Sequence, residues 1–231
     1  MRVHIAEACG FCYGVRRAVE LASTAEKGTH TLGPIIHNPQ LVNSLSARGV
    51  SPVDSLQDVA DGSKVLIRSH GVGPHVYEEA EAKHLDVVDA TCPHVKKAQQ
   101  DARKVINDKK ALIIVGEKDH PEVISISQWG CNRAIIIDKV EEAKEIPYCE
   151  HMGVVVQTTF SQSRFKQIES VLAEKTDDLD VYMTICTATR QRQEAAVELA
   201  KKVDAMIVIG GKNSANTGRL AQVCAEQGCP T

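Results

Sequence analysis

Short apolar runs rich in valine and isoleucine recur along the chain, and segments with helical periodicity separate them. Most of these runs are continuous and do not alternate with polar residues, which is typical of strands buried on both faces of a sheet. The pattern predicts strands at Val3–Ala8, Thr31–Ile36, Lys64–Arg68, Val87–Ala90, Leu112–Gly116, Ala134–Ile137, Gly153–Gln157, Val181–Ile185 and Ala205–Ile209. Regular alternation of strands and helices predicts an α/β fold with mainly parallel sheets.

Proline and a capping serine mark where several predicted helices begin. Pro39, Pro93 and Pro121 lie near first helical turns, where the missing N–H group is harmless. Ser161 is a candidate N-cap for the helix that follows it. Residues 139–150 are predicted to form a surface connection with a short helix.

Three cysteines, Cys12, Cys92 and Cys186, each lie where a predicted strand leads into a predicted helix. The carboxyl ends of parallel strands form the crevice where ligands bind, so three thiols at such positions suggest one shared ligand. A helix N-terminus stabilises the thiolate, which is the form that binds iron. We therefore expect an iron–sulfur cluster. Three protein ligands would leave one iron of a 4Fe–4S cube open, as in catalytic metal sites.

The comparable spacing of these junctions predicts three small β/α lobes in a pseudo-threefold arrangement around the cluster. The expected lobes are residues 1–91 with Cys12, residues 92–183 with Cys92, and residues 184–231 with Cys186.

Polar side chains follow other predicted strands and are expected to face the same crevice. These residues are His37, His70, His120, Thr158, Thr159, Ser214 and Asn216. Neutral imidazoles, hydroxyls, amides and helix N-termini together make a cradle for phosphate or diphosphate. A single histidine at a strand end is more often a structural hydrogen-bonding group, whereas three in matching positions favour a ligand site.

Glu122 is the best candidate for proton transfer, because it lies two residues after His120 at the start of a helix. The alternative is that Glu122 is an ordinary first-turn carboxylate favoured by the helix dipole. Spacing alone does not separate the two.

Composition narrows the class of protein. The 231 residues are 43% hydrophobic and 25% charged, with a net charge of −3 and no long basic run, which argues against a nucleic-acid partner. An apolar signal-peptide core and a membrane-spanning run are both missing from the sequence, so we expect a cytoplasmic protein without a membrane partner. In that compartment eight cysteines indicate metal or redox chemistry instead of disulfides. Small buried hydrophobic roles are expected for Cys131, Cys149, Cys224 and Cys229.

Eight motifs, in order along the chain, resemble those of the hydroxymethylbutenyl diphosphate reductase family. They are GFCYGVRRAVE, GPIIHNPQLV, RSHGV, DATCPHV, GEKDHPEV, QTTFS, CTATRQRQEA and GGKNSANTGRL. The resemblance runs from the N-terminus to about Leu220. Any one motif alone would be a weak signal, but together they are highly specific.

The resemblance implies a three-lobed iron–sulfur enzyme with Cys12, Cys92 and Cys186 as ligands of a 4Fe–4S cluster. It implies catalytic roles for Glu122, His120 and Thr158, and substrate binding by His37, His70, His120, Thr158, Thr189, Ser214 and Asn216. The implied reaction is the reductive dehydroxylation of 4-hydroxy-3-methylbut-2-enyl diphosphate to isopentenyl and dimethylallyl diphosphate. This is the last step of the methylerythritol phosphate route to isoprenoids. Electrons would come from a ferredoxin- or flavodoxin-type donor.

Three features depart from the family pattern. Ala215 stands where many members carry a second serine, and Cys9 forms a C-x-x-C pair with Cys12 that the pattern does not require. The family also usually continues for some tens of residues past Thr231, so we expect either that the chain is a fragment or that its third lobe is incomplete.

Two other functions stay open from the residues. A thiol–disulfide oxidoreductase could use Cys9 and Cys12, although Cys92, Cys186 and the histidines would then have no role. A structural zinc protein would favour closely spaced ligand pairs, and only Cys9 with Cys12 offers one.

Overall fold

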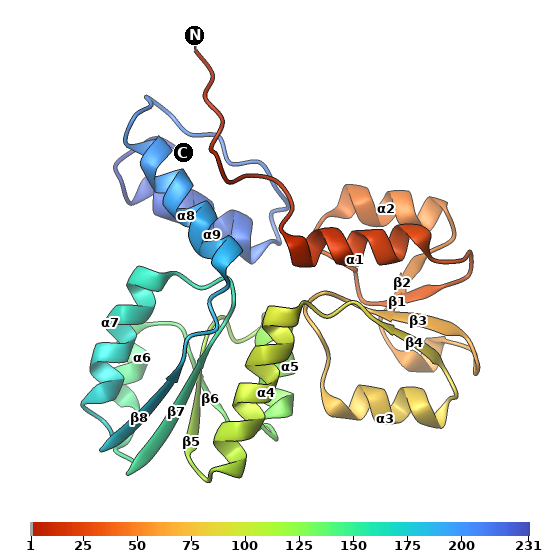
Figure 1. Ribbon diagram of the computed structural model, residues 1–231, viewed down its shortest axis with the longest axis horizontal. Coiled ribbons are helices and arrows are strands. Elements are labelled where there is room, and N and C mark those ends of the chain that lie inside the picture. Colours follow the sequence, from red (N-terminus) through yellow and green to blue (C-terminus); the bar gives the residue numbers. More distant parts are fainter. Residues whose placement is uncertain (1) are drawn as a thin grey trace.

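The computed structural model describes residues 2–231 and contains two four-stranded parallel sheets and a separate pair of helices (Figure 1). The α/β fold with parallel sheets is therefore confirmed. The two sheets and the helix pair form three lobes that meet near the middle of the molecule.

The first lobe is built on a sheet with the strand order β2-β1-β3-β4. Its elements are α1 (Tyr13–Thr24), β1 (His30–Leu32), α2 (Pro39–Ala47), β2 (Ser51–Val53), a 3₁₀ turn η1 (Leu56–Asp58), β3 (Lys64–Ile67), α3 (Pro74–Ala82) and β4 (Asp86–Asp89). Leu66 packs with α1 and α2 on one face, and Val65 packs with η1 and α3 on the other. Successive residues of β3 thus enter two separate cores, which explains its continuous apolar run.

The second lobe repeats this plan with the strand order β6-β5-β7-β8. Its elements are α4 (Pro93–Asn107), β5 (Ala111–Val115), α5 (Pro121–Trp129), β6 (Ile135–Ile137), α6 (Val140–Glu145), β7 (His151–Val156), α7 (Gln162–Ala173) and β8 (Asp178–Tyr182). Ile113 and Val115 face α6 and α7, whereas Leu112 and Ile114 face α4 and α5. The short helix expected within residues 139–150 is confirmed as α6.

The third lobe consists of α8 (Thr187–Ala200) and α9 (Ala215–Ala225), which pack around Ala196, Cys224 and Cys229. The predicted strands Val3–Ala8 and Ala205–Ile209 are wrong, because neither segment pairs with a strand anywhere in residues 2–231. Ile207 and Ile209 are 85% and 92% exposed. An apolar run forms a strand only when a neighbour supplies ladder partners, and sequence pattern does not reveal that neighbour.

Other differences from the predicted elements are small. The strand β2 was missed, because Ser51–Val53 is short and contains a proline, as edge strands do. Cys224 and Cys229 are buried as expected, but Cys131 is exposed, so its predicted burial is wrong. Cys131 lies with φ of 57° in the turn after α5, which carries its side chain to the surface.

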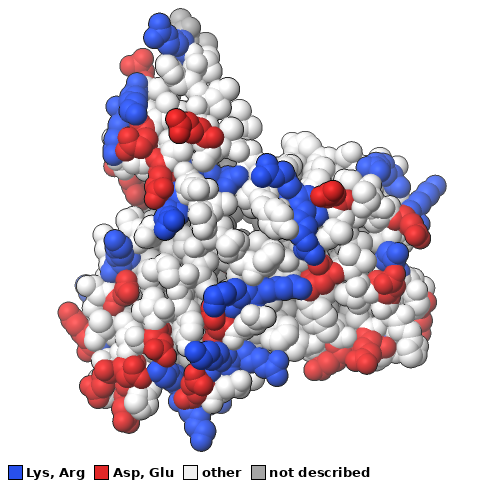
Figure 2. Space-filling view, viewed as in Figure 1, with Lys and Arg blue, Asp and Glu red and all other residues white. Residues whose placement is uncertain are grey.

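Charges of both signs are interspersed over the three lobes on the face shown in Figure 2. In the part of the chain that the structure describes, every helix is too short or too polar to cross a membrane.

Candidate active site

The three cysteines at predicted strand-to-helix junctions are the N-cap residues of three helices. Cys12 caps α1, Cys92 caps α4 and Cys186 caps α8, each with an extended backbone. Free amide N–H groups of a first helical turn and the positive end of the helix dipole favour a thiolate at this position. The sequence pattern therefore located all three caps correctly.

Contacts place Cys92 against the start of α1. Gly14 lies in the first turn of α1, and a methyl group added there would come within 2.6 Å of the Cys92 Sγ atom. Burial raises the pKa of the Cys92 thiol, and the neighbouring Cys12 and Cys186 raise it further, while amides of the first turn of α4 lower it. The three thiols, one from the start of each helix, thus share one region of the molecule.

Backbone hydrogen bonds connect two cysteines to the loops that carry the polar candidates. The Cys92 amide donates to the carbonyl of Ser69, next to His70, at 3.0 Å. The Cys186 amide donates to the carbonyl of Thr158 at 3.1 Å. Thr189 is buried, its amide donates to the Cys186 Sγ atom at 3.3 Å, and its hydroxyl lies 3.0 Å from the same sulfur.

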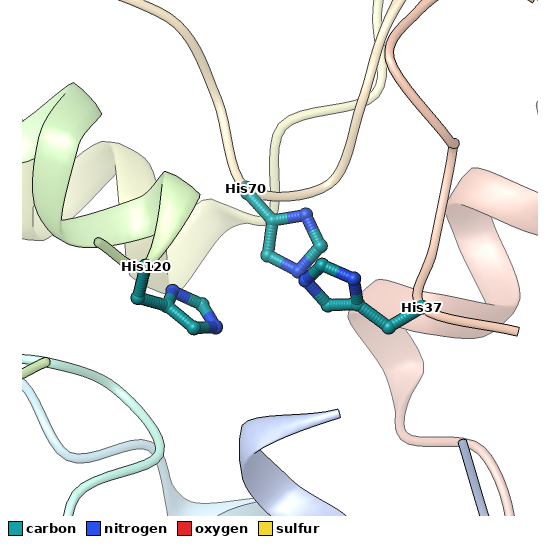
Figure 3. Close-up of side chains that lie close together, drawn as sticks. All are labelled: His37, His70 and His120. Atoms are coloured by element: carbon teal, nitrogen blue, oxygen red, sulfur yellow. The ribbon is translucent and has the colours of Figure 1, made fainter. Parts of the chain in front are cut away.

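His37, His70 and His120 form a cluster at the carboxyl ends of β1, β3 and β5 (Figure 3). The ring centroids of His37 and His70 are 4.4 Å apart, and that of His120 lies 5.7 Å and 5.5 Å from them. The Nε2 atom of His37 and the Nδ1 atom of His70 are buried without a hydrogen-bond partner within residues 2–231. Buried polar atoms without partners need an explanation, and a ligand hydrogen-bonded to the cluster would supply one.

All three imidazoles are neutral at pH 7. Desolvation lowers the pKa of His120 to about 4, with further contributions from the charges of His37 and Arg68. Burial is also the main cause that lowers the pKa of His37 and takes that of His70 well below its usual range. The cluster therefore offers hydrogen bonds without carrying charge.

The role of His120 as the N-cap of α5 fixes the position of its proton. Its Nδ1 atom accepts a hydrogen bond from the amide of Glu122 at 3.2 Å. A neutral imidazole that accepts at Nδ1 carries its hydrogen on Nε2, so the outer edge of the ring is a donor. One nitrogen atom from each of the three rings lies within 4.8 Å of the other two, close enough for a metal ion. A metal at Nε2 of His120 would need the lone pair of that atom, so the cluster suits an anion better.

Glu122 is 2% exposed and points at Thr158, not into solvent. Its Oε1 atom accepts the Thr158 amide at 2.6 Å, and its Oε2 atom accepts the Thr158 hydroxyl at 2.8 Å. Burial raises the pKa of Glu122 to about 7, although the hydrogen bonds from Thr158 oppose the rise and Glu117 adds to it. A carboxyl group that exchanges its proton near neutral pH is suited to general acid catalysis.

The loop before α9 brings the third lobe to the histidines. The Nδ2 atom of Asn213 lies 3.4 Å from the Nδ1 atom of His37, and Gly211 lies against the His37 carbonyl. Ser214 is the N-cap of α9 and accepts from the Thr217 amide at 3.4 Å, whereas Asn216 follows in the first turn of that helix. A cavity of about 500 Å³ opens here between the lobes, and His37, His120 and Asn213 contribute to its wall.

Two residues of this region were given no role from the sequence. Asn213 adjoins the predicted Ser214, and Arg68 belongs to the RSHGV motif two residues before His70. Their positions within those motifs were the sequence signal that could have identified them as candidate site residues. Thr159, in contrast, accepts a hydrogen bond from the side chain of Gln157 at 3.1 Å and forms no hydrogen bond with the histidines among the described residues.

The chain is similar to the 4-hydroxy-3-methylbut-2-enyl diphosphate reductase of Pelobacter propionicus, with 46% identity over 98% of this chain and 81% of the relative. It is 44% identical to the reductase of the same name from Thermoanaerobacter sp., over 99% of this chain and 82% of the relative.

Solved structures of similar proteins show the same fold. The E-1-hydroxy-2-methyl-but-2-enyl-4-diphosphate reductase of Plasmodium falciparum matches with a TM-score of 0.91 and 28% identity, over 96% of this chain and 72% of that one. A second structure, described as (E)-4-hydroxy-3-methyl-but-2-enyl diphosphate reductase, the terminal enzyme of the non-mevalonate pathway, matches with a TM-score of 0.73. It is 41% identical over 97% of this chain and 82% of that one.

A sequence model of the family described as LytB protein matches residues 3–231. With this match over nearly the whole chain and relatives above 40% identity, the chain belongs to the LytB protein family.

Proposed function

We propose that this chain reduces 4-hydroxy-3-methylbut-2-enyl diphosphate to isopentenyl and dimethylallyl diphosphate with loss of the allylic hydroxyl as water. The observation that carries the proposal is one arrangement: backbone hydrogen bonds join the capping cysteines Cys92 and Cys186 to the loop that carries His70 and to Thr158, which is the hydrogen-bond partner of Glu122. The names of similar reductases support the choice of substrate.

The donor set fits an iron–sulfur cluster. Cys12, Cys92 and Cys186 offer thiolate sulfur from three separate elements, and each sulfur lies at a helix N-terminus that favours its charged form. When bound, a 4Fe–4S cluster held by these three residues would supply redox capacity and a Lewis-acidic iron without a protein ligand. Binding would release the thiol protons, including that of Cys92, whose pKa is raised.

The histidine cluster would hold the diphosphate of the substrate. Neutral imidazole N–H groups donate hydrogen bonds to phosphate oxygens. Because they carry no charge, they do not form ion pairs with carboxylates of the protein. Asn213, Ser214 and Asn216 would add amide, hydroxyl and helix N-terminal donors from the third lobe. The diphosphate would then lie where the three lobes meet and fix the direction of the allylic end.

The reaction consumes two electrons and two protons for each hydroxyl released as water. Glu122, with a pKa of about 7, would deliver a proton from a site closed to bulk water. Thr158 would orient the Glu122 carboxyl group through its hydroxyl and amide, and Thr189 would hold the Cys186 sulfur.

A ferredoxin- or flavodoxin-type protein is proposed as the electron donor, as the family resemblance implies. All eight cysteines are free in the structure, which suits the reducing cytoplasm that we propose as the location.

Anaerobic purification followed by iron, sulfide and turnover assays tests the proposal. The wild-type protein should be brown, contain iron and sulfide in near-equal amounts, and convert the substrate to both products with a one-electron reductant. Cys92→Ser should lose the cluster and the activity, whereas Cys131→Ser, at an exposed cysteine, should keep both. Turnover by Cys92→Ser at the wild-type rate would contradict the proposal.

Cys9→Ala separates the proposal from thiol–disulfide exchange at Cys9 and Cys12. Cys9 is exposed, and only Cys12 of the pair belongs to the three capping residues. The Cys9→Ala variant should retain cluster and turnover. If Cys9→Ala loses a dithiol-exchange activity that wild type has, and neither protein reduces the substrate, the thiol–disulfide oxidoreductase is favoured. A protein that contains zinc but no sulfide would favour the structural zinc protein.

A further inference from the structure

Arg68 is a half-buried cation that has no partner among residues 2–231. It directly follows β3, and its Nε atom is shielded from solvent without a hydrogen bond. The guanidinium group forms no ion pair and no side-chain hydrogen bond with any of residues 2–231. Burial lowers its pKa, but an arginine side chain stays protonated at neutral pH. A buried guanidinium N–H group without a hydrogen-bond partner carries a free-energy cost and needs an explanation.

The backbone leaves room for this side chain. Gly33 has φ of 70°, and a methyl group added there would come within 2.6 Å of the Arg68 Nη1 atom. Arg68 also lines a cavity of about 250 Å³ between the first lobe and α5, together with Gly71 and Ser125. Arg68 therefore lies where the first two lobes meet, with its guanidinium beside Gly33, and Asp54 lines the same cavity without forming an ion pair with it among the described residues.

The charge of Arg68 reaches the histidine cluster. It is one of the causes that lower the pKa of His37, of His70 and of His120. Partial burial weakens the screening of such interactions by water and salt. An anion seated on the three imidazoles would therefore be attracted by the same charge.

The larger cavity beside the cluster lacks a surplus of positive charge. Its wall carries two lysines and four carboxylates, namely Lys118, Lys139, Glu117, Asp119, Asp138 and Glu142. The neutral histidines supply donors but no charge, whereas a diphosphate brings several negative charges. A nearby unpaired cation would offset that charge.

We propose that Arg68 is the fixed positive charge behind the histidine cluster and attracts the diphosphate group of the ligand. This inference rests on the proposed function and deepens it, because it assigns a source of positive charge for the diphosphate that the histidine cluster would bind. Arg68 acts here as a positioning residue for the diphosphate, and it takes no part in breaking the C–O bond.

The test compares binding of inorganic pyrophosphate by calorimetry with steady-state kinetics of the cluster-loaded enzyme. Arg68→Gln should raise the dissociation constant for pyrophosphate and the KM for substrate about tenfold, and leave kcat within about twofold. Arg68→Lys, which keeps the charge, should restore most of the affinity. Arg133→Gln removes the same charge from an exposed residue in the turn after α5 and should change neither value.

Each outcome bears on the proposal. Wild-type affinity for pyrophosphate in folded Arg68→Gln would overturn it. A lower kcat with unchanged KM, a fall in Tm and no rescue by Arg68→Lys would assign Arg68 a purely structural role and overturn it as well. If the wild-type enzyme reduces the substrate and Arg68→Gln binds pyrophosphate with wild-type affinity, this inference alone is refuted. If the wild-type enzyme neither binds pyrophosphate nor reduces the substrate, the proposed function is refuted.

Discussion

Glu122 and Thr158 meet because β5 and β7 are neighbours in the second sheet. Glu122 lies in the first turn of the helix after β5, and Thr158 lies in the loop after β7, 36 residues further along the chain. Both oxygens of the buried carboxylate accept hydrogen bonds from this one threonine, at 2.6 and 2.8 Å. Parallel pairing thus brings two segments that are distant in sequence into hydrogen-bond contact.

Replacing Glu122 by Gln should nearly abolish turnover without weakening substrate binding. The amide keeps the shape and can still accept from the Thr158 N–H, but it cannot release a proton, so we expect kcat to fall by about 10² or more. Rapid-quench and steady-state assays give kcat, and calorimetry gives pyrophosphate affinity. Glu145→Gln, at an exposed residue that ends α6, is the matched control. Full activity in Glu122→Gln would remove this residue from the proton path.

Stability should fall with rising pH because of the same carboxyl group. Its pKa rises from 4.5 to about 7 on folding, so between these values the native state binds more protons than the unfolded state. The contribution of the neutral form is therefore complete below pH 4.5 and is lost as pH rises through 7. A shift of this size corresponds to about 3 kcal/mol.

Urea unfolding at pH 5 and pH 8 measures this effect. Glu122→Gln has no proton to lose at this position. The free energy of unfolding of wild type should therefore fall by about 3 kcal/mol more than that of the variant between pH 5 and pH 8. Other titrating groups cancel in the difference between the two proteins. Parallel pH curves for wild type and variant would show that Glu122 is not desolvated in solution.

His120 should affect stability in the opposite direction. Burial lowers its pKa from 6.5 to about 4, so the native state binds fewer protons than the unfolded state between these values. Its contribution is present above pH 6.5 and is lost as pH falls toward 4, by about 3 kcal/mol. His120→Asn retains an acceptor for the N-cap of α5 and should flatten this acid limb of the stability curve, whereas His75→Asn, at an exposed histidine, should not. An unchanged acid limb in His120→Asn would contradict the neutral cluster.

The local sequence pattern predicted where the candidate site residues lie in their elements better than it predicted which of them contact one another. The caps Cys92 and Cys186 follow from strand-to-helix junctions that a single sequence displays, whereas Cys12 caps α1 without a paired strand before it in residues 2–231. The contact between Glu122 and Thr158 depends on which strands are neighbours, and Arg68 stands out only because it has no partner among residues 2–231. The failed strand at Ala205–Ile209 has the same cause, since its apolar residues carry no information about a pairing neighbour.

Gly14 should be essential for bringing Cys92 into the cysteine group. A Cβ atom at this position would lie 2.6 Å from the Cys92 Sγ and 3.2 Å from its Cβ, closer than van der Waals contact allows. Alanine normally favours a helix over glycine by up to about 1 kcal/mol, so Gly14→Ala should leave α1 formed but displace the Cys92 sulfur or the first turn. We expect iron incorporation during anaerobic reconstitution to fall severalfold, with far-ultraviolet circular dichroism unchanged. Gly218→Ala in α9, where an added methyl group meets no atom within 4 Å, isolates the helix-propensity effect and should bind iron normally. If Gly14→Ala takes up iron and sulfide like wild type, the start of α1 does not determine where the Cys92 thiol lies, and the convergence of the three cysteines must have another cause.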